Sequence, residues 1–172
     1  SLALYVNSAG GIQAVQRDSG TTKSLNSNTG VIVAAGWHLV TFSFDYSLAV
    51  GSRGKLFLDG IDVTLTDFLG LIFDVPTGVY KIGSYNNSNY FNGYRSMLSV
   101  NNAPMSLAEH QQLYNGGKPL NPQTLFGSNC KYFFNPDNSG ATAQFTVNDA
   151  VNSINATSVN LETADKTTTT PY

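Results

Sequence analysis

The chain has 172 residues, of which 41% are hydrophobic and only 12% are charged, and its formal net charge at pH 7 is −2. This length suits one hydrophobic core, so we expect a single domain over residues 1–172. We expect neither nucleic acid nor a membrane as a partner, because the few charges form no run and no apolar stretch approaches the roughly 18 residues of a membrane span.

The first predicted elements are two strands joined by a turn. Residues 2–6 alternate in the way a β-strand does, residues 7–11 are rich in Asn and Gly, and an extended pattern resumes over residues 12–17. We predict a hairpin there and a polar loop over residues 18–30. Because the chain opens directly in a strand, we also expect the domain to lack its first strands.

The strongest strand pattern lies at residues 37–45. Val40, Phe42 and Phe44 share one face of the expected strand, and Trp37 starts the other face. Apolar residues on both faces indicate a strand that is covered on both sides. We therefore predict a central strand, with Trp37 packed as a structural residue.

The clearest turn signal is Asp59-Gly60, which lies between the two apolar runs of residues 55–63. Both turn positions need positive φ angles, and Asp and Gly tolerate them, so we predict a tight hairpin with a type I′ turn. Further strands are predicted at residues 79–83 and 91–100.

One short helix is predicted after these strands. Ser106 and Glu109 have the spacing of a capping box, and Gly116-Gly117 followed by Pro119 indicates where the helix stops. The remaining predicted segments are short strands at residues 130–134, 142–147 and 158–161 and a polar tail at residues 163–172.

Five motifs stand in the order found in one known family. They are residues 37–45, residues 55–60, Lys81-Ile82-Gly83, residues 90–93 and residues 106–117. In this order they resemble the laminin G-like, pentraxin-like branch of the concanavalin A-like lectin and glucanase superfamily. The resemblance covers residues 1–117 and implies an all-β fold, an antiparallel β-sandwich or jelly roll with one short helix.

The later segments resemble a narrower group within that branch. Residues 117–121, 132–134 and 160–165 look like the closing part of laminin G-like domains found in bacteriophage virion proteins. The resemblance implies a non-enzymatic structural and binding component of the virion surface, such as a capsid decoration or a tail fibre protein. Its partners would be other virion subunits, including further copies of itself, and host-cell glycans.

Two other functions stay open. One is a carbohydrate-binding or adhesion module of a secreted, extracellular bacterial protein, and the other is an atypical glycan-processing enzyme. Glycosidases need two carboxylates that flank one bond, whereas the only two glutamates, Glu109 and Glu162, stand far apart in the sequence. Neither His38 nor His110 lies in a nucleophile motif, and we predict no catalytic residue.

The candidate glycan site is the loop that contains Tyr85, Asn86, Asn87, Asn89 and Tyr90. Side-chain amides exchange hydrogen bonds with sugar hydroxyls, and aromatic rings stack on the apolar face of a sugar. The competing interpretation is an ordinary hairpin loop rich in Asn.

No cofactor is required by this interpretation, and calcium is the metal that the resemblance leaves open. Aspartate oxygens suit this hard cation, but aspartates also stabilise turns by local hydrogen bonds, so no ligand set is assigned. Cys130 and two histidines are too few for a zinc site, and a lone cysteine forms no intrachain disulfide. The aspartates considered are Asp45, Asp59, Asp62, Asp67 and Asp74.

Overall fold

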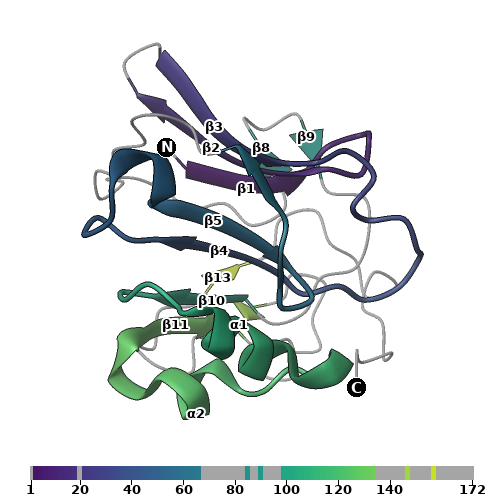
Figure 1. The fold of residues 1–172 in the computed structure, drawn as a ribbon. Coiled ribbons are helices and arrows are strands. Elements are labelled where there is room, and N and C mark those ends of the chain that lie inside the picture. The colour runs from purple at the N-terminus through teal and green to yellow at the C-terminus, as the bar shows by residue number, and fades with distance from the viewer. Residues whose placement is uncertain are drawn as a thin grey trace.

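The computed structural model describes residues 2–18, 21–66, 84–85, 89–90, 98–134, 146–147 and 156–157 (Figure 1). In these ranges every strand pairing is antiparallel, and helices are few and short. The predicted all-β class is confirmed at this level, while the jelly-roll arrangement stays a prediction.

The strands follow one another along the chain as β1 (Leu2–Val6), β2 (Ile12–Asp18), β3 (Thr21–Ser27), β4 (Val40–Phe44), β5 (Gly54–Leu58), β6 (Ile61–Asp62), β7 (Thr64–Thr66), β8 (Ser84–Tyr85), β9 (Asn89–Tyr90), β10 (Leu98–Asn101), β11 (Cys130–Phe134), β12 (Thr146–Val147) and β13 (Ala156–Thr157). The α-helices are α1 (Leu107–Tyr114) and α2 (Pro122–Phe126), and short 3-10 turns lie at Val50–Ser52, Asn115–Gly117 and Gly127–Asn129.

The predicted first hairpin is confirmed as β1 and β2, which open a four-stranded sheet in the order β1-β2-β3-β7. The side chain of Asn7 accepts hydrogen bonds from the backbone N–H groups of Ala9 and Gly11, each at 2.9 Å, and so closes the turn. Gly10 has a φ of 72°, and a Cβ there would lie 2.9 Å from the carbonyl oxygen of Ile32. This turn therefore needs a glycine.

The predicted loop over residues 18–30 is wrong in its centre, where β3 forms a full antiparallel pairing with β2. Its residues are mostly polar because one face of the sheet is solvated, and Thr is favoured in such strands. Leu25 is the fully buried apolar residue of β3, and the Ser27 hydroxyl accepts a 2.8 Å hydrogen bond from the N–H of Ile12. Polarity alone therefore gave a misleading prediction.

The second sheet has the order β4-β5-β6 and contains the predicted hairpin. Asp59 and Gly60 have φ angles of 53° and 77°, as a type I′ turn requires. The strand predicted at residues 37–45 is shorter than expected, because residues 37–39 precede β4. Within the described ranges β5 has a strand on each side and β4 pairs with β5, so the central position of β4 stays a prediction.

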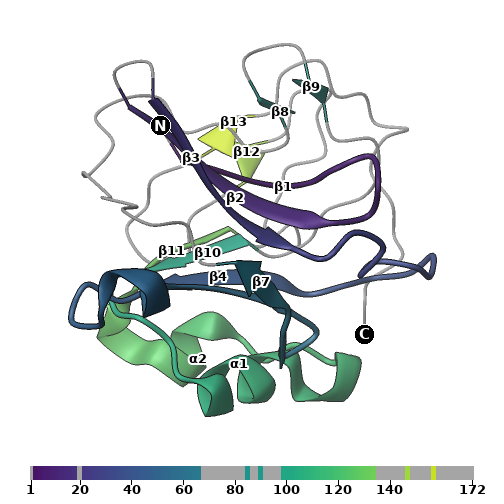
Figure 2. The same ribbon diagram turned by 45° about the horizontal axis from the view of Figure 1, so that its top comes forward.

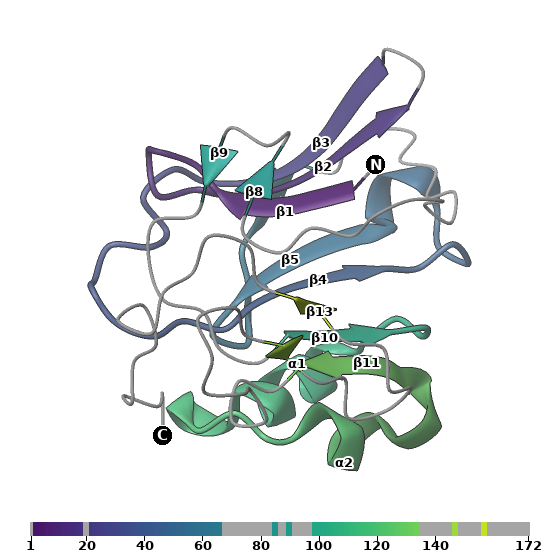
Figure 3. The ribbon, with the colours of Figure 1, turned by 180° about the vertical axis from the view of Figure 1, so that it is seen from behind.

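The main core lies between these two sheets. The predicted common face of β4 is confirmed, since its three apolar side chains pack against this core. Each fully buried aliphatic side chain of the core stabilises the fold by about 1.5–3 kcal/mol. Figures 1 and 3 show β4 and β5 between the four-stranded sheet and a layer that contains α1, β10 and β11. The buried cluster consists of Ile12, Ala14, Leu25, Leu56 and Leu58, with Val40, Phe42 and Phe44 packed against it.

Helix α1 begins with the predicted capping box. The N–H of Glu109 donates to the Ser106 hydroxyl, and the N–H of Ser106 donates to the Glu109 carboxylate at 2.7 Å. A second helix, α2, contradicts the expected single helix. Its signals were present in the sequence, since Asn121 caps it and Pro122 fills its first position. Figure 2 shows α1 and α2 side by side next to β4.

The last predicted strands are confirmed in part. Strand β11 coincides with the predicted 130–134 segment, and β10 forms the end of the segment predicted at residues 91–100. Strand β12 ends the segment predicted at 142–147 and pairs with β13, which precedes the predicted 158–161 strand. Residues 79–83, 158–161 and 163–172 lie outside the described residues. Among the helices described, none has the length and apolarity that crossing a membrane would require.

Candidate functional site

The residues predicted to bind a glycan gather at one hairpin. Strand β8 pairs with β9, so that Tyr85 lies opposite Asn89 and Ser84 lies opposite Tyr90. Asn86 and Asn87 fall in the connection, outside the described residues. The structure therefore brings Tyr85, Asn89 and Tyr90 into neighbouring backbone positions, and their role in glycan binding stays a prediction.

A second cluster forms around Asp59, the first residue of the β5–β6 turn. Its Oδ1 atom accepts a 2.8 Å hydrogen bond from the N–H of Leu39, and its Oδ2 atom lies 2.8 Å from Nδ1 of His38. The N–H of Asp59 donates back to the carbonyl oxygen of Leu39 at 2.9 Å. Asp59 thus holds the segment that precedes β4. Trp37 lies in that segment and is half-buried, so the prediction that it belongs to the core strand is wrong.

His38 is the imidazole partner of Asp59 in this cluster. Its Nε2 atom lies 3.2 Å from the carbonyl oxygen of Ala34, so both ring nitrogens face acceptors. The hydrogen bond to Asp59 raises the pKa of His38 above its ordinary value, against the opposite effect of burial. The protonated ring can donate to both partners at once, and this suits it to a structural bridge.

His110 has the opposite environment. It is 0% exposed on the inner face of α1, and its ring stacks on Phe57 of β5 with a centroid distance of 3.6 Å. Its Nδ1 atom lies 2.7 Å from the hydroxyl of Thr41, whereas Nε2 has no hydrogen-bond partner in the described part of the protein. Burial lowers the pKa of His110 to about 4, so this ring is neutral at pH 7.

The turn at Asp59-Gly60 also packs against α1. A Cβ at Gly60 would lie 3.1 Å from the Cα of Gln111 and 3.4 Å from the Cβ of Tyr114. The Trp-His segment, the Asp-Gly hairpin and the capped helix therefore meet, and we name this region the motif junction. It comprises His38, Thr41, Phe57, Asp59, Gly60 and His110.

Where the structure describes them, the aspartates considered for calcium already have hydrogen-bond partners. The Asp45 carboxylate accepts hydrogen bonds from the N–H and the hydroxyl of Ser47, at 2.9 and 2.7 Å. Asp62 accepts from the N–H of Thr64 at 2.9 Å and pairs with Lys55 at 3.3 Å. Asp67 and Asp74 lie outside the described residues, and within the described ones no group of three or more His, Cys, Asp or Glu gathers. Calcium binding stays a prediction.

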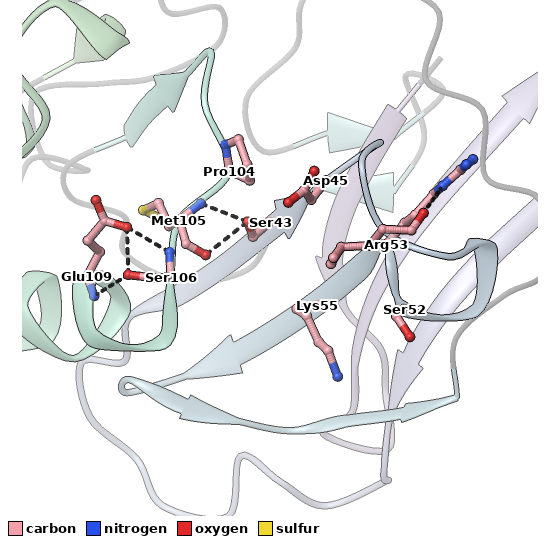
Figure 4. A pocket seen from close by; sticks show the side chains of 10 residues that line it. Ser43, Asp45, Ser52, Arg53, Lys55, Pro104, Met105, Ser106 and Glu109 are labelled. Atoms are coloured by element: carbon pink, nitrogen blue, oxygen red, sulfur yellow. Dashed lines mark hydrogen bonds between the residues drawn. The ribbon is translucent and has the colours of Figure 1, made fainter.

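A pocket that the sequence did not reveal lies between β4–β5 and the segment before α1 (Figure 4). Its volume is about 370 Å³. Ser43 links its two sides, because its hydroxyl accepts a 3.0 Å hydrogen bond from the N–H of Met105, which lies 62 positions later in the chain. We call it the Ser43 pocket. Its lining residues are Ser43, Asp45, Leu48, Ser52, Arg53, Lys55, Pro104, Met105, Ser106 and Glu109.

No protein-family model, no curated protein and no solved structure matches this chain. The geometry and the sequence motifs therefore carry the functional argument. In the motif junction, His38 and His110 hold together segments that are distant in the sequence. Glu109 serves as the N-terminal cap partner of α1.

Proposed function

We propose that the chain is a laminin G-like jelly-roll domain that works as a structural and binding module of a virion, without catalysis. The observation that carries this proposal is the motif junction. The Trp-His segment, the Asp-Gly hairpin and the capped helix carry the laminin G-like resemblance, and they are the segments that contact one another. Motifs that form one packed unit support a shared fold more strongly than separate matches do.

In this proposal the domain acts by surface complementarity, as a capsid decoration or as part of a tail fibre. Interface centres are depleted in charged residues and enriched in aromatic ones. The chain fits this chemistry, because only 12% of its residues are charged and it contains nine tyrosines and ten phenylalanines. Its partners are other virion subunits, including copies of itself.

The test of the virion role is the protein content of particles purified from the source of this chain. We expect mass spectrometry to find the chain in a fixed, whole-number ratio to a major capsid or tail protein. A chain that is missing from the particles and present in the medium of bacterial cells would overturn the virion role. That result would favour the secreted adhesion module.

Host-glycan adhesion is the second activity in the proposal, and the pairing of β8 with β9 favours it. The register sets Tyr85 opposite Asn89 in a hairpin, so a residue type that can stack on a sugar and one that can bond to its hydroxyls occupy paired backbone positions. Many symmetric copies would strengthen a weak single contact through avidity.

A glycan array read with the full chain tests this activity. We expect binding that is lost in Tyr85→Ala and Asn87→Ala and retained in Asn102→Ala, which removes an exposed amide elsewhere in the described chain. Equal binding by all three variants would remove the β8–β9 hairpin from the proposal.

A further inference from the structure

The connection between β4 and β5, residues 45–53, presents three large apolar side chains to solvent. Tyr46, Leu48 and Val50 are 49%, 44% and 42% exposed. Figures 1 and 2 show this connection, with its 3-10 turn, at the margin of the molecule. Apolar side chains that gather at an exposed place mark an interaction surface, whereas single ones do not.

Hydrogen bonds fix the shape of this connection before any partner arrives. The N–H of Asp45 donates to the carbonyl oxygen of Arg53 at 2.9 Å and closes its base. The N–H of Ser52 donates to the carbonyl oxygen of Ala49 at 2.8 Å. The Arg53 side chain reaches back through Nε to the carbonyl oxygen of Leu48, also at 2.9 Å. A segment that is already ordered loses little conformational freedom on binding.

A second exposed segment, residues 104–109, forms the opposite side of the Ser43 pocket. Pro104 and Leu107 are its exposed apolar residues, and Glu109 is its charged one. Figure 4 shows Glu109 on one side of Ser43 and Arg53 on the other. The two segments therefore both combine apolar side chains with a charge, and the charges of Glu109 and Arg53 are opposite.

These two charged groups have bonding capacity left. Within the described chain, the terminal amino groups of Arg53 and the Oε1 atom of Glu109 make no hydrogen bond. The other two charged groups of the pocket have partners, since Lys55 pairs with Asp62 at 3.3 Å and Asp45 accepts two bonds from Ser47. An ion pair with another molecule would therefore use Arg53 and Glu109.

We infer that this face is a two-fold symmetric interface, in which residues 45–53 of one copy of the chain cover residues 104–109 of a second copy, and the reverse. Around a two-fold axis a patch meets itself, so groups on opposite sides of the axis come together. With the axis near Ser43, Arg53 of each copy meets Glu109 of the other. The apolar side chains of the two segments then cover one another.

The charge pattern favours a second copy over an unlike partner. A surface with opposite charges on its two sides is complementary to itself, and needs no partner of one dominant sign. An anionic membrane is disfavoured, because the two segments together contain two carboxylates and the chain has a net charge of −2. The inference rests on the proposed assembly of the chain with copies of itself, and it names the surface that this assembly uses.

Sedimentation velocity of the full chain at micromolar concentrations tests the inference. We expect a monomer–dimer equilibrium that depends on concentration. Val50→Asp should weaken dimerisation at least about tenfold, because it buries an unpaired carboxylate among apolar side chains. The matched control is Val33→Asp, which changes a more exposed valine outside both segments and should leave dimerisation unchanged.

A mixing experiment tests the two-fold arrangement itself. Arg53→Glu brings two carboxylates together at each of the two contacts, and Glu109→Arg brings two guanidinium groups together, so each variant alone should be monomeric. An equimolar mixture of the two should form a heterodimer, because both contacts then join opposite charges.

Milder variants show that the effect does not come from damage to the fold. Glu109→Gln keeps a cap partner for α1 but loses the charge, and should weaken dimerisation about threefold. Asp45→Asn keeps an acceptor for Ser47 and removes a negative charge from the same segment as Arg53, so it should not weaken dimerisation.

Three outcomes would overturn the inference. One is a chain that stays monomeric, and another is a dimer that Val50→Asp and Arg53→Glu form as tightly as the unchanged chain does. The third is a mixture of Arg53→Glu and Glu109→Arg that stays monomeric. The particle-content measurement is separate, so a monomeric chain found in a fixed ratio on particles would reject this interface and leave the virion role standing.

Discussion

The two histidines occupy contrasting regions next to the sheet formed by β4, β5 and β6. His38 stands at the partly exposed end of the β5–β6 hairpin, where a carboxylate and a carbonyl face its ring nitrogens. His110 is enclosed between α1 and β5, with a phenyl ring on its face and one nitrogen without a partner in the described chain. The same side chain therefore serves as a hydrogen-bonding bridge in one place and as a neutral packing residue in the other.

Because their pKa values shift in opposite directions, the two histidines affect the stability of the fold in different pH ranges. The folded-state pKa of His110 is lowered to about 4 from an ordinary value of 6.5, so its contribution is complete above pH 6.5 and is lost as the pH falls towards 4. The folded-state pKa of His38 is raised, so its contribution is complete below pH 6.5 and is lost as the pH rises through that higher value.

The largest expected effect is acid destabilisation through His110. A shift from 6.5 to about 4 corresponds to about 3 kcal/mol at the acid end of the window. Urea unfolding of the full chain should show this loss beginning near pH 6.5, before most carboxylates titrate. The variant His110→Phe keeps a ring on Phe57 and removes the titrating group, so its stability should stay level between pH 6.5 and 5.

The prediction is contradicted if the His110→Phe variant loses as much stability between pH 6.5 and 5 as the unchanged protein does. Acid sensitivity would then come from other groups, and the buried environment of His110 would not be its cause. His38 cannot mimic the effect, because its raised pKa keeps it protonated as the pH falls through this window.

The next largest effect is expected at Gly60, where the β5–β6 hairpin packs against α1. Gly60→Ala forces a side chain into a positive φ of 77° and places its Cβ 3.1 Å from the backbone of Gln111, so we expect a loss of about 2 kcal/mol. The matched control is Gly30→Ala, which has a similar φ of 68° but no atom within 4 Å of the new Cβ. Thermal unfolding of both variants measures the difference, which reports the packing of the hairpin on α1. Equal losses would mean that this packing contributes nothing.

Sequence reasoning succeeded where a few adjacent residues determine the geometry. Asp59-Gly60 defines its turn through the φ angles of two residues, and Ser106 with Glu109 defines a cap within one helical turn. Both predictions are confirmed because no distant partner is needed. The helix α2 was missed although Asn121 and Pro122 carry the same kind of local signal.

The failures share a dependence on partners far along the chain. Strand β3 has one fully buried apolar residue, Leu25, so only its pairing with β2 identifies it as a strand. The contact between Thr41 and His110 joins residues 69 positions apart, and no local pattern marks it. The Ser43 pocket was unpredictable for the same reason, since its two sides come from separate parts of the sequence.

A smaller effect is expected where His38 contacts Asp59. Asp59→Asn keeps a residue that tolerates a positive φ and keeps an acceptor for Leu39, but it removes the negative charge beside His38. We expect a loss of about 1 kcal/mol at pH 6, and a smaller loss at pH 8, where more of the His38 ring is neutral. NMR titration should show the pKa of His38 falling and that of His110 unchanged. A parallel change at both histidines would mean that the two regions are coupled.

An effect of similar size is expected in the helix that holds His110 in place. Ser106→Ala removes the cap of α1 and should lower stability by about 1 kcal/mol, as such caps usually do. His110 is in the first turn, where its N–H donates to the carbonyl oxygen of Ser106 at 3.1 Å, so fraying would admit water to the ring. The pKa of His110 should then rise towards 6.5 while that of His38 stays fixed. If the stability falls and the pKa of His110 does not move, the ring is held by Phe57 and Thr41 alone, and the cap only sets the length of the helix.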